Sequence, residues 1–282
     1  MDKEQVMEQS LVSVIIRTCG RPKVLLNAME SVRKQSYANI EVVVAEDGPN
    51  VSESFLNEHF ADLNYRYVST GEKRGRCIVG NLGLELSKGK YCIFLDDDDL
   101  LYPSHIETLV EAISKSSVRA VYSIAEERQI IKKNGECKVK RTLVRYKQPF
   151  NRLLLCYMNY IPIQSILFER SLYEELGGFD EELELLEDWD LWLRYGLSND
   201  FLFVPQVTSA YFTPYRGAGH RNRGMALHHS EDVVRQKHMT YQCSLNAEQI
   251  SKDMDYILNV FNKKGIVFYM KKIRNYLLYK DI

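Results

Sequence analysis

YCIFLDDDD, residues 91–99, is the most informative segment of the sequence, because a continuous apolar run leads directly into four aspartates. A short run of this kind predicts a strand that is covered on both faces of a sheet. Ligands of open α/β sheets bind outside the carboxyl ends of the strands. Four adjacent carboxylates repel one another unless a cation lies among them, and their oxygen atoms suit Mg²⁺ or Mn²⁺. We therefore expect a central strand with a divalent-metal site at its end; the alternative is a solvated acidic loop.

Strands and helices alternate on both sides of this run. Further strands are expected at 11–17, 40–47, 63–69, 118–127 and 200–212. Helices are expected at 23–37, 76–89, 105–116 and 185–197, the second of them closed by Gly89. This alternation predicts an α/β fold with a mainly parallel sheet and right-handed crossovers. Asn134-Gly135 lies between two alternating runs and predicts a hairpin insertion near 127–145.

Composition excludes several classes of protein. The chain has 282 residues, 45% of them hydrophobic, and its 37 Lys and Arg nearly balance 38 Asp and Glu, for a net charge of −1. This balance argues against a dedicated nucleic-acid binder, which is usually basic. No apolar run approaches the roughly 20 residues that span a bilayer, and the polar first residues are unlike a secretory signal. Six cysteines without a C-x-x-C pair indicate thiols in a reducing cytoplasm.

Carboxylates outside the acidic run are further candidates. Asp47 ends an expected strand, at the same edge as Asp96, and could accept hydrogen bonds from a nucleotide base or ribose; the alternative is an Asx turn. Asp188 faces the apolar stripe of its expected helix, where partial burial would raise its pKa and favour a general base. If Asp188 instead caps the helix, the helix dipole lowers that pKa. Arg194 follows Asp190 by four residues, which predicts an ion pair.

Five motifs occur in order along the chain: SVIIRTCGRP, VVVAEDGP, GNLGLELSKGKYCIFLDDDD, GGFDEEL and EDWDLWLR. Together, over about residues 11–216, they resemble the family 2 glycosyltransferases of the GT-A fold. The resemblance implies a nucleotide-diphosphate sugar as donor, a divalent metal on the diphosphate, and transfer with inversion at the anomeric carbon. Two positions depart from the family pattern. Arg17 ends the first strand where the family commonly has Pro, and Gly80 precedes Asn81 where an arginine is frequent.

The resemblance also assigns roles to individual residues. The nucleotide sugar would be bound by Thr18, Asp47, Asp96, Asp97, Arg216 and His220, with uracil at Asp47 and the ribose at Asp96. Asp98 and Asp96 would hold the metal, Mn²⁺ or Mg²⁺. Asp188 matches the catalytic base, and Glu187 would orient it or the acceptor. Arg216 and His220 lie in a glycine-rich stretch that is expected to be a loop folding over the diphosphate; the alternative is a solvated mobile loop.

Three parts of the chain are expected: an N-terminal extension at 1–10, the GT-A catalytic domain at 11–224 and a helical C-terminal extension at 225–282. Residues 263–280 combine lysines and one arginine with an apolar stripe and contain no acid. Such a stretch suits an anionic lipid surface. The alternatives are a helix packed on the catalytic domain and a contact within a homodimer.

The predicted function is transfer of a hexose or N-acetylhexosamine from a UDP-sugar to a hydroxyl of a saccharide or lipid-linked glycan. Bacterial surface polysaccharide synthesis is the expected setting, in the cytoplasm and on the inner face of the cell membrane. Two rival functions stay open. One is a metal-dependent nucleotidyltransferase, which would release pyrophosphate, and the other is a non-catalytic binder of nucleotide sugars or glycans.

Overall fold

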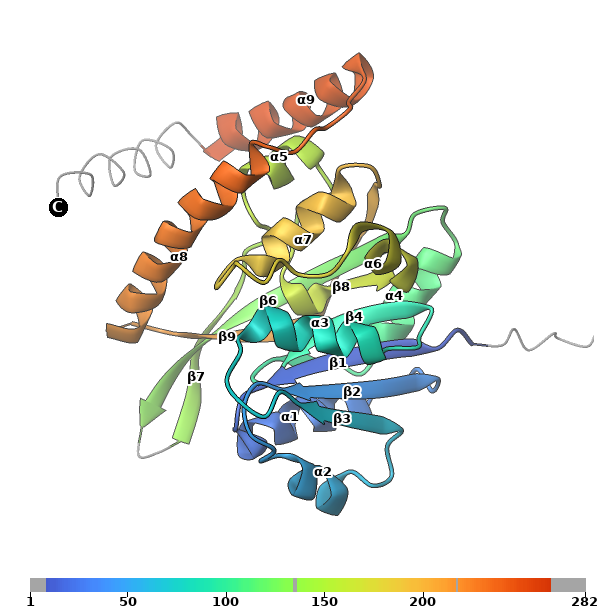
Figure 1. Cartoon of the computed structure of the whole chain (residues 1–282). Helices are drawn as coiled ribbons and strands as arrows, with labels where there is room; N and C mark the ends of the chain where they lie inside the picture. Colours follow the sequence, from blue (N-terminus) through green and yellow to red (C-terminus); the bar gives the residue numbers. More distant parts are fainter. Residues whose placement is uncertain (1–8, 134–135, 217, 265–282) are drawn as a thin grey trace, which may run out of the picture.

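The computed structural model describes residues 9–264 except 134–135 and 217 (Figure 1). The strands are β1 (Val12–Thr18), β2 (Ile40–Glu46), β3 (Tyr65–Ser69), β4 (Tyr91–Asp96), β5 (Leu100–Leu101), β6 (Ala120–Lys133), β7 (Glu136–Val144), β8 (Ile166–Glu169) and β9 (Phe201–Pro214). The helices are α1 (Pro22–Arg33), α2 (Glu53–His59), α3 (Arg76–Leu86), α4 (His105–Ser114), α5 (Arg152–Tyr157), α6 (Arg170–Leu176), α7 (Glu187–Gly196), α8 (Ala218–His238) and α9 (Ala247–Lys264), with a 3₁₀ turn at Ile163–Ser165.

One sheet runs through the molecule in the order β3-β2-β1-β4-β8-β6-β9-β5. The pairs from β3 to β4 are parallel, β8 is antiparallel to both of its neighbours, and β9 is again parallel to β6. β7 pairs with β6 in the antiparallel manner of the predicted hairpin. The α/β fold with a helical C-terminal part is therefore confirmed.

Helices cover both faces of the sheet (Figure 1). On β4, Ile93 and Leu95 belong to the core that includes residues of α1 and α4. Cys92 and Phe94 belong to the core that includes residues of α3 and α7. Successive side chains of a strand point to opposite faces, so the apolar run 91–95 of β4 is what burial on both faces requires.

Two local expectations are wrong. The helix at 76–89 ends at Leu86, and Gly89 serves a close approach instead, because a β-carbon there would lie 2.6 Å from the Ser13 backbone nitrogen. The expected loop after β9 is largely helix, since α8 begins at Ala218. α8 therefore crosses the expected boundary at 224/225, and the division into domains stays a prediction.

The C-terminal part contains α8 and α9, and α9 packs beside α5. Residues 265–282, which make up most of the predicted lipid-binding stretch, lie outside the described residues. Across the described part of the chain, no helix has the length and apolar character to cross a bilayer.

Candidate active site

A cavity of about 1270 Å³ opens where β1, β2 and β4 end. Parallel pairing places Arg17 beside Asp96, and Asp47 directly follows β2, so all three line the same cavity. Asp188, at the start of α7, and one side of α8 also contribute to its lining. Carboxylates that are far apart in the sequence therefore share one space, as the strand order at this edge of the sheet predicts.

Arg17 is a buried cation between two carboxylates. Its Nε donates a hydrogen bond of 2.8 Å to Asp96 Oδ1, and its Nη1 donates one of 2.8 Å to Glu187 Oε1. Burial opposes the charge, but Asp96 and Glu187 outweigh it and hold the pKa of Arg17 above its usual value. Arg17 thus connects the ends of β1 and β4 to the start of α7.

Asp97 is fully buried and holds the loop between β1 and α1. Its Oδ2 accepts hydrogen bonds from Thr18 Oγ1 at 2.7 Å and from Arg21 Nε at 3.1 Å, and Arg21 Nη2 pairs with Oδ1. Burial raises the pKa of Asp97 to about 6, although the Thr18 hydroxyl and the Arg21 charge favour the carboxylate. Asp97 therefore supports the cavity wall from within.

Asp98 is more open than the two aspartates before it. Its side chain is 52% exposed, compared with 28% for Asp96, and its Oδ2 lies 3.7 Å from Arg21 Nη1. Within the described ranges, no three His, Cys, Asp or Glu side chains converge into a ready-made ligand set. An ion such as Mg²⁺ needs only one or two protein carboxylates where substrate phosphates and water complete its shell. Asp98, with the Asp96 oxygen that Arg17 does not bind, fits this arrangement.

Asp47 is buried and positions the loop between β3 and α3. Its Oδ1 accepts hydrogen bonds from the backbone N–H groups of Arg74 at 2.6 Å and Gly75 at 3.0 Å. Gly75 has φ = +100°, a conformation that glycine adopts at little cost. Instead of the Asx turn considered as the alternative, Asp47 makes a longer-range contact, which fixes it at the cavity wall.

Asp188 occupies the first turn of α7. Its Oδ2 accepts a hydrogen bond of 3.0 Å from Asn159 Nδ2, and its Oδ1 accepts one of 2.9 Å from the Trp189 backbone nitrogen. Burial, and after it the charge of Glu187, raises the pKa of Asp188 to about 7. Burial and the charge of Glu187 therefore outweigh the Asn159 and Trp189 hydrogen bonds and the Arg17 charge, which lower the pKa of Asp188. A carboxylate that lines a cavity and titrates near neutrality is suited to accept a proton.

Leu186 brings the chain into this helix with φ = 60°, and no other non-glycine residue in the described ranges has a positive φ. Left-handed backbone costs an ordinary side chain about 1–3 kcal/mol and persists only where the surroundings hold it. The turn at Leu186 directs Glu187 toward Arg17.

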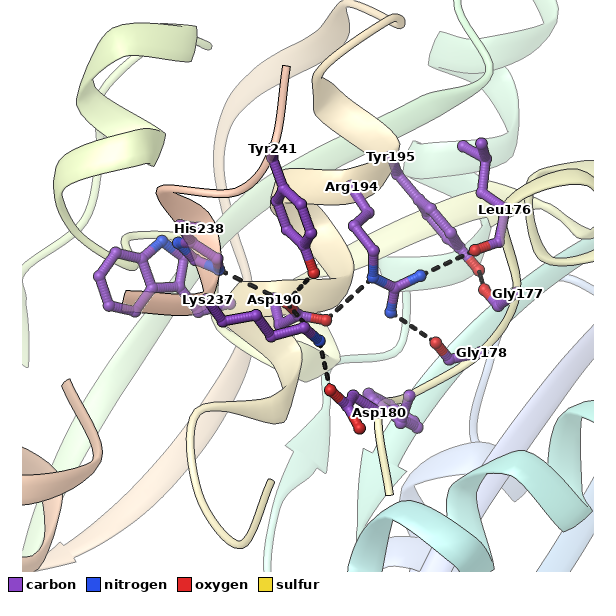
Figure 2. Close-up of polar contacts among 12 residues, drawn as sticks. Leu176, Gly177, Gly178, Asp180, Asp190, Arg194, Tyr195, Lys237, His238 and Tyr241 are labelled. Carbon is purple, nitrogen blue, oxygen red and sulfur yellow. Dashed lines mark hydrogen bonds and ion pairs between the residues drawn. The ribbon is translucent and has the colours of Figure 1, made fainter. Parts of the chain in front are cut away.

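Asp190 anchors α8 to α7 (Figure 2). Its fully buried carboxylate lies 2.9 Å from Arg194 Nε and 3.0 Å from Lys237 Nζ. The Tyr241 hydroxyl donates to it at 2.7 Å, and His238 Nε2 lies 3.5 Å away. Burial opposes the charge of Asp190, but His238, Arg194 and Tyr241 outweigh it and hold its pKa well below the ordinary value. The predicted pair with Arg194 is confirmed, and the cluster fixes the end of α8 near the cavity.

Comparison with known proteins identifies the family. The model of the family described as "Glycosyl transferase family 2" matches residues 13–177, more than half of the chain. The chain belongs to glycosyl transferase family 2. The resemblance seen in the five motifs is therefore confirmed.

Curated relatives of this glycosyltransferase family are similar over most of the chain. "Uncharacterized glycosyltransferase YwdF" of Bacillus subtilis is 28% identical over 71% of this chain and 73% of its own length. "Uncharacterized protein y4gI" of Sinorhizobium fredii is 31% identical over 65% of this chain, but the match spans only 20% of that protein. The Escherichia coli "UDP-Glc:alpha-D-GlcNAc-diphosphoundecaprenol beta-1,3-glucosyltransferase WfgD" is 26% identical over 66% of this chain and 70% of its own.

Solved structures show the same fold. Staphylococcus aureus TarS in complex with UDP-GlcNAc superposes with a TM-score of 0.60 at 18% identity, over 74% of this chain and 60% of that chain. The mannosyltransferase PcManGT from Pyrobaculum calidifontis, in complex with GDP-Man and Mn²⁺, has a TM-score of 0.56 at 16% identity, over 89% of this chain and 81% of that chain. The GT-A fold is thereby confirmed; at such identities these likenesses speak for fold alone.

Most of the residues that the family resemblance singled out line the cavity: Thr18, Asp47, Asp96, Asp97, Asp98, Glu187 and Asp188. Arg216 is exposed, stacks on the ring of Tyr215 at 4.9 Å and is not part of the lining. His220 falls within α8, and its side chain lies outside the described part of the structure. The individual roles of all these residues stay predictions.

Sequence reasoning missed two residues that act on this site. Arg17 was noted only as a departure from the family pattern, although a charged residue at the end of a buried strand signals carboxylate partners. Asn159 lies between α5 and the 3₁₀ turn and carries no pattern of its own. Its contact with Asp188 depends on the tertiary fold, so the sequence offers no signal for it.

Proposed function

We propose that this chain transfers a hexose or N-acetylhexosamine from a UDP-sugar to a hydroxyl group of a saccharide acceptor, with inversion at the anomeric carbon. The observation that carries the proposal is the position of Asp188. This carboxylate has a raised pKa and lines the same cavity as Asp47, Asp96 and Asp98. A proton acceptor and a set of donor-binding carboxylates in one cavity are what glycosyl transfer requires.

In the proposed reaction the acceptor oxygen forms a bond to the anomeric carbon while the bond from that carbon to the diphosphate oxygen breaks. The hydroxyl proton passes to Asp188, and UDP leaves with the bonding electron pair. When the base and the leaving group lie on opposite faces of the sugar, the anomeric centre inverts, as in inverting glycosidases. Asn159 and the Trp189 N–H hold the Asp188 carboxylate in place. Glu187, itself held by Arg17, orients the base or the acceptor.

Asp98, together with Asp96, would hold Mn²⁺ or Mg²⁺. A bound divalent ion stabilises the negative charge that develops on a departing diphosphate. The exposure of the Asp98 side chain supports this assignment, and so does the Mn²⁺ in the complex of the similarly folded PcManGT. Asp47 and Thr18 lie where the nucleotide is expected, at the ends of β2 and β1.

We also propose that the acceptor saccharide is linked to a lipid, in bacterial surface polysaccharide synthesis. The name of WfgD describes a UDP-glucose donor and a diphosphoundecaprenol-linked acceptor, and TarS has been solved with UDP-GlcNAc. A lipid-linked acceptor would bring the enzyme from the cytoplasm to the inner face of the cell membrane. A homodimer stays a prediction.

The deciding experiment measures UDP release from a panel of UDP-sugars, with Mn²⁺, with Mg²⁺ and with a chelator. We expect metal-dependent UDP release by the native protein, and a loss of at least about 10² in the Asp188→Asn variant, because the amide cannot accept the proton. Calorimetry of UDP with and without Mn²⁺ follows donor binding separately. Release of pyrophosphate from UTP and a sugar 1-phosphate, in a parallel assay, would favour a nucleotidyltransferase. UDP binding without any turnover would favour the non-catalytic binder.

A further inference from the structure

Arg235 of α8 lies between two aromatic side chains beside the base. Its ζ-carbon is 4.6 Å from the ring centre of Tyr157 and 5.4 Å from that of Trp189, the residue that follows Asp188. In the ranges that the structure describes, no carboxylate lies within ion-pair distance of Arg235, not even Glu231 one turn earlier on α8. Among the described residues, this half-buried guanidinium therefore lines the cavity without an ion-pair partner.

The other lining cations lie on other elements of the fold. Arg17 and Arg21 pair with the carboxylates at the ends of β1 and β4. Lys73 and Arg74 lie on the loop that Asp47 holds, where the nucleotide is expected. Arg76 lies 3.8 Å from Glu187 Oε1. Among the lining cations of the described residues, Arg235 is thus the one that α8 places next to Trp189.

The stacking of Arg235 prepares it for an anion. A guanidinium that lies over an aromatic ring can still present its N–H groups for bidentate hydrogen bonds to phosphate. Lys237 and His238 follow on the same helix and are fixed by Asp190 (Figure 2). The backbone that carries Arg235 is therefore held in place before any ligand arrives.

A second cavity, of about 370 Å³, also has Arg235 in its lining. Its lining includes Cys156, Leu193, Leu197 and the strongly exposed Met239. Arg235 lines both cavities, so a polar and an apolar space meet at this guanidinium. An amphiphile with a sugar, an anionic linker and a hydrocarbon chain has the same order of chemical groups.

We propose that Arg235 binds the diphosphate of a lipid-linked sugar acceptor and that the adjoining apolar cavity takes the first part of its prenyl chain. The inference rests on the proposed function and deepens it by naming the residue that recognises the diphosphate and the cavity that takes the chain. With the diphosphate at Arg235, the acceptor sugar lies on the Trp189 side, toward Asp188.

The test is a calorimetric titration of farnesyl diphosphate into the full chain, with UDP and Mn²⁺ in excess so that the donor site is filled. We expect Arg235→Gln to weaken binding about tenfold or more, the effect of losing hydrogen bonds to a charged group. Arg235→Lys keeps the positive charge but loses the paired N–H donors of the guanidinium. It should bind farnesyl diphosphate with intermediate affinity. Gln236→Ala changes the exposed neighbour on α8 and should bind as the native protein does, and thermal unfolding of each variant checks that it is folded.

Two further ligands separate the parts of the proposal. Inorganic pyrophosphate carries the anion without the chain, and farnesol carries the chain without the anion, so each should bind more weakly than farnesyl diphosphate. Equal affinity of the native protein and Arg235→Gln for farnesyl diphosphate would overturn the role of Arg235. Pyrophosphate binding as tightly as farnesyl diphosphate would overturn the prenyl site. Failure of the proposed function itself would give a different result, because UDP would then not bind in the calorimetric titration with Mn²⁺.

Discussion

Arg17 and Glu187 form a buried hydrogen-bonded ion pair of 2.8 Å that joins the end of β1 to the start of α7. Gly80 makes room for it: a β-carbon there would lie 2.5 Å from the Phe179 ring and 3.4 Å from the Arg17 side chain. The two positions at which the sequence departs from the family pattern therefore meet in space. We infer that, in this chain, the buried arginine between β1 and α7 is Arg17 of β1, and that it takes the place of an arginine at position 80 of α3.

The first prediction concerns this ion pair. Arg17→Met leaves Glu187 and Asp96 without their buried partner, and breaking such a pair costs about 3–5 kcal/mol of unfolding free energy. The charge of Arg17 also lowers the pKa of Asp188, so its loss should raise that pKa further. Urea unfolding measures the first effect. The second should appear as an upward shift of the acid limb in the pH profile of UDP release.

Arg76→Met is the matched control. Arg76 lies 3.8 Å from the same Glu187 oxygen, but its side chain is 49% exposed. A half-exposed pair at this distance contributes about 0–1 kcal/mol. If Arg76→Met destabilised the protein as much as Arg17→Met, burial would not be the property that distinguishes the two arginines.

The second prediction separates two adjacent aspartates. Asp97→Ala leaves the Thr18 hydroxyl and the Arg21 guanidinium without their acceptor, and should lower the unfolding free energy by about 1–3 kcal/mol. Asp98→Ala removes an exposed side chain and should change stability by no more than about 0.5 kcal/mol. Asp98→Ala should nevertheless abolish the gain in UDP affinity that Mn²⁺ gives. If Asp97→Ala were stable and lost the gain in UDP affinity that Mn²⁺ gives, the metal ligand would be Asp97 rather than Asp98.

The third prediction concerns pH. With a pKa near 7, Asp188 is the deprotonated base only above neutrality, so activity should fall as the pH drops through 7 rather than through 4. The unfolding free energy should depend on pH in the opposite direction from activity. The folded-state pKa lies above the unfolded value of about 3.9, so the contribution of Asp188 is fully present below pH 4 and is lost as the pH rises through 7.

Asp188→Asn tests that sign. The variant carries no charge at this position. Between pH 5 and pH 8 the native protein should therefore lose unfolding free energy relative to the variant. Urea unfolding at these two values measures the difference. An equal dependence on pH in the two proteins would show that Asp188 titrates at an ordinary value and that the acid limb of activity belongs to another group.

The convergence of carboxylates was predictable because it follows from topology. Parallel strands end at one edge of the sheet, so Asp47 and Asp96 had to come together once β1, β2 and β4 were recognised. The ion pair of Arg17 with Glu187 depends on a contact across 170 residues, which local pattern does not encode. The fold class was therefore accessible from the sequence, whereas the network that links the two halves of the cavity was not.

The missed and misplaced helices have physical causes as well. α2 is a short helix whose start is held by Glu46, which accepts hydrogen bonds of 3.0 Å from the backbone nitrogens of Val51 and Ser52. At the start of α8, Gly219 and Gly224 suggested a loop. Extending a helix that already exists costs much less than nucleating one, so α8 can continue through both glycines.

The last prediction concerns Asn159, a positioning residue for the base. The Ile161 backbone N–H donates a hydrogen bond of 3.2 Å to Asn159 Oδ1, which leaves the amide nitrogen to donate to Asp188 at 3.0 Å. This donation favours the charged form of Asp188 and lowers its pKa. Asn159→Ala should therefore raise the pH at which UDP release is half-maximal, in addition to slowing it.

Asn159→Asp distinguishes orientation from charge. The aspartate can still accept from Ile161, but it places a second carboxylate beside Asp188, which should raise the pKa of the base more than alanine does. The half-maximal pH should thus increase in the order native, Asn159→Ala, Asn159→Asp. A purely structural role of Asn159 predicts lower activity at every pH with an unchanged midpoint, so the pH profile of the two variants decides whether this amide acts through the base.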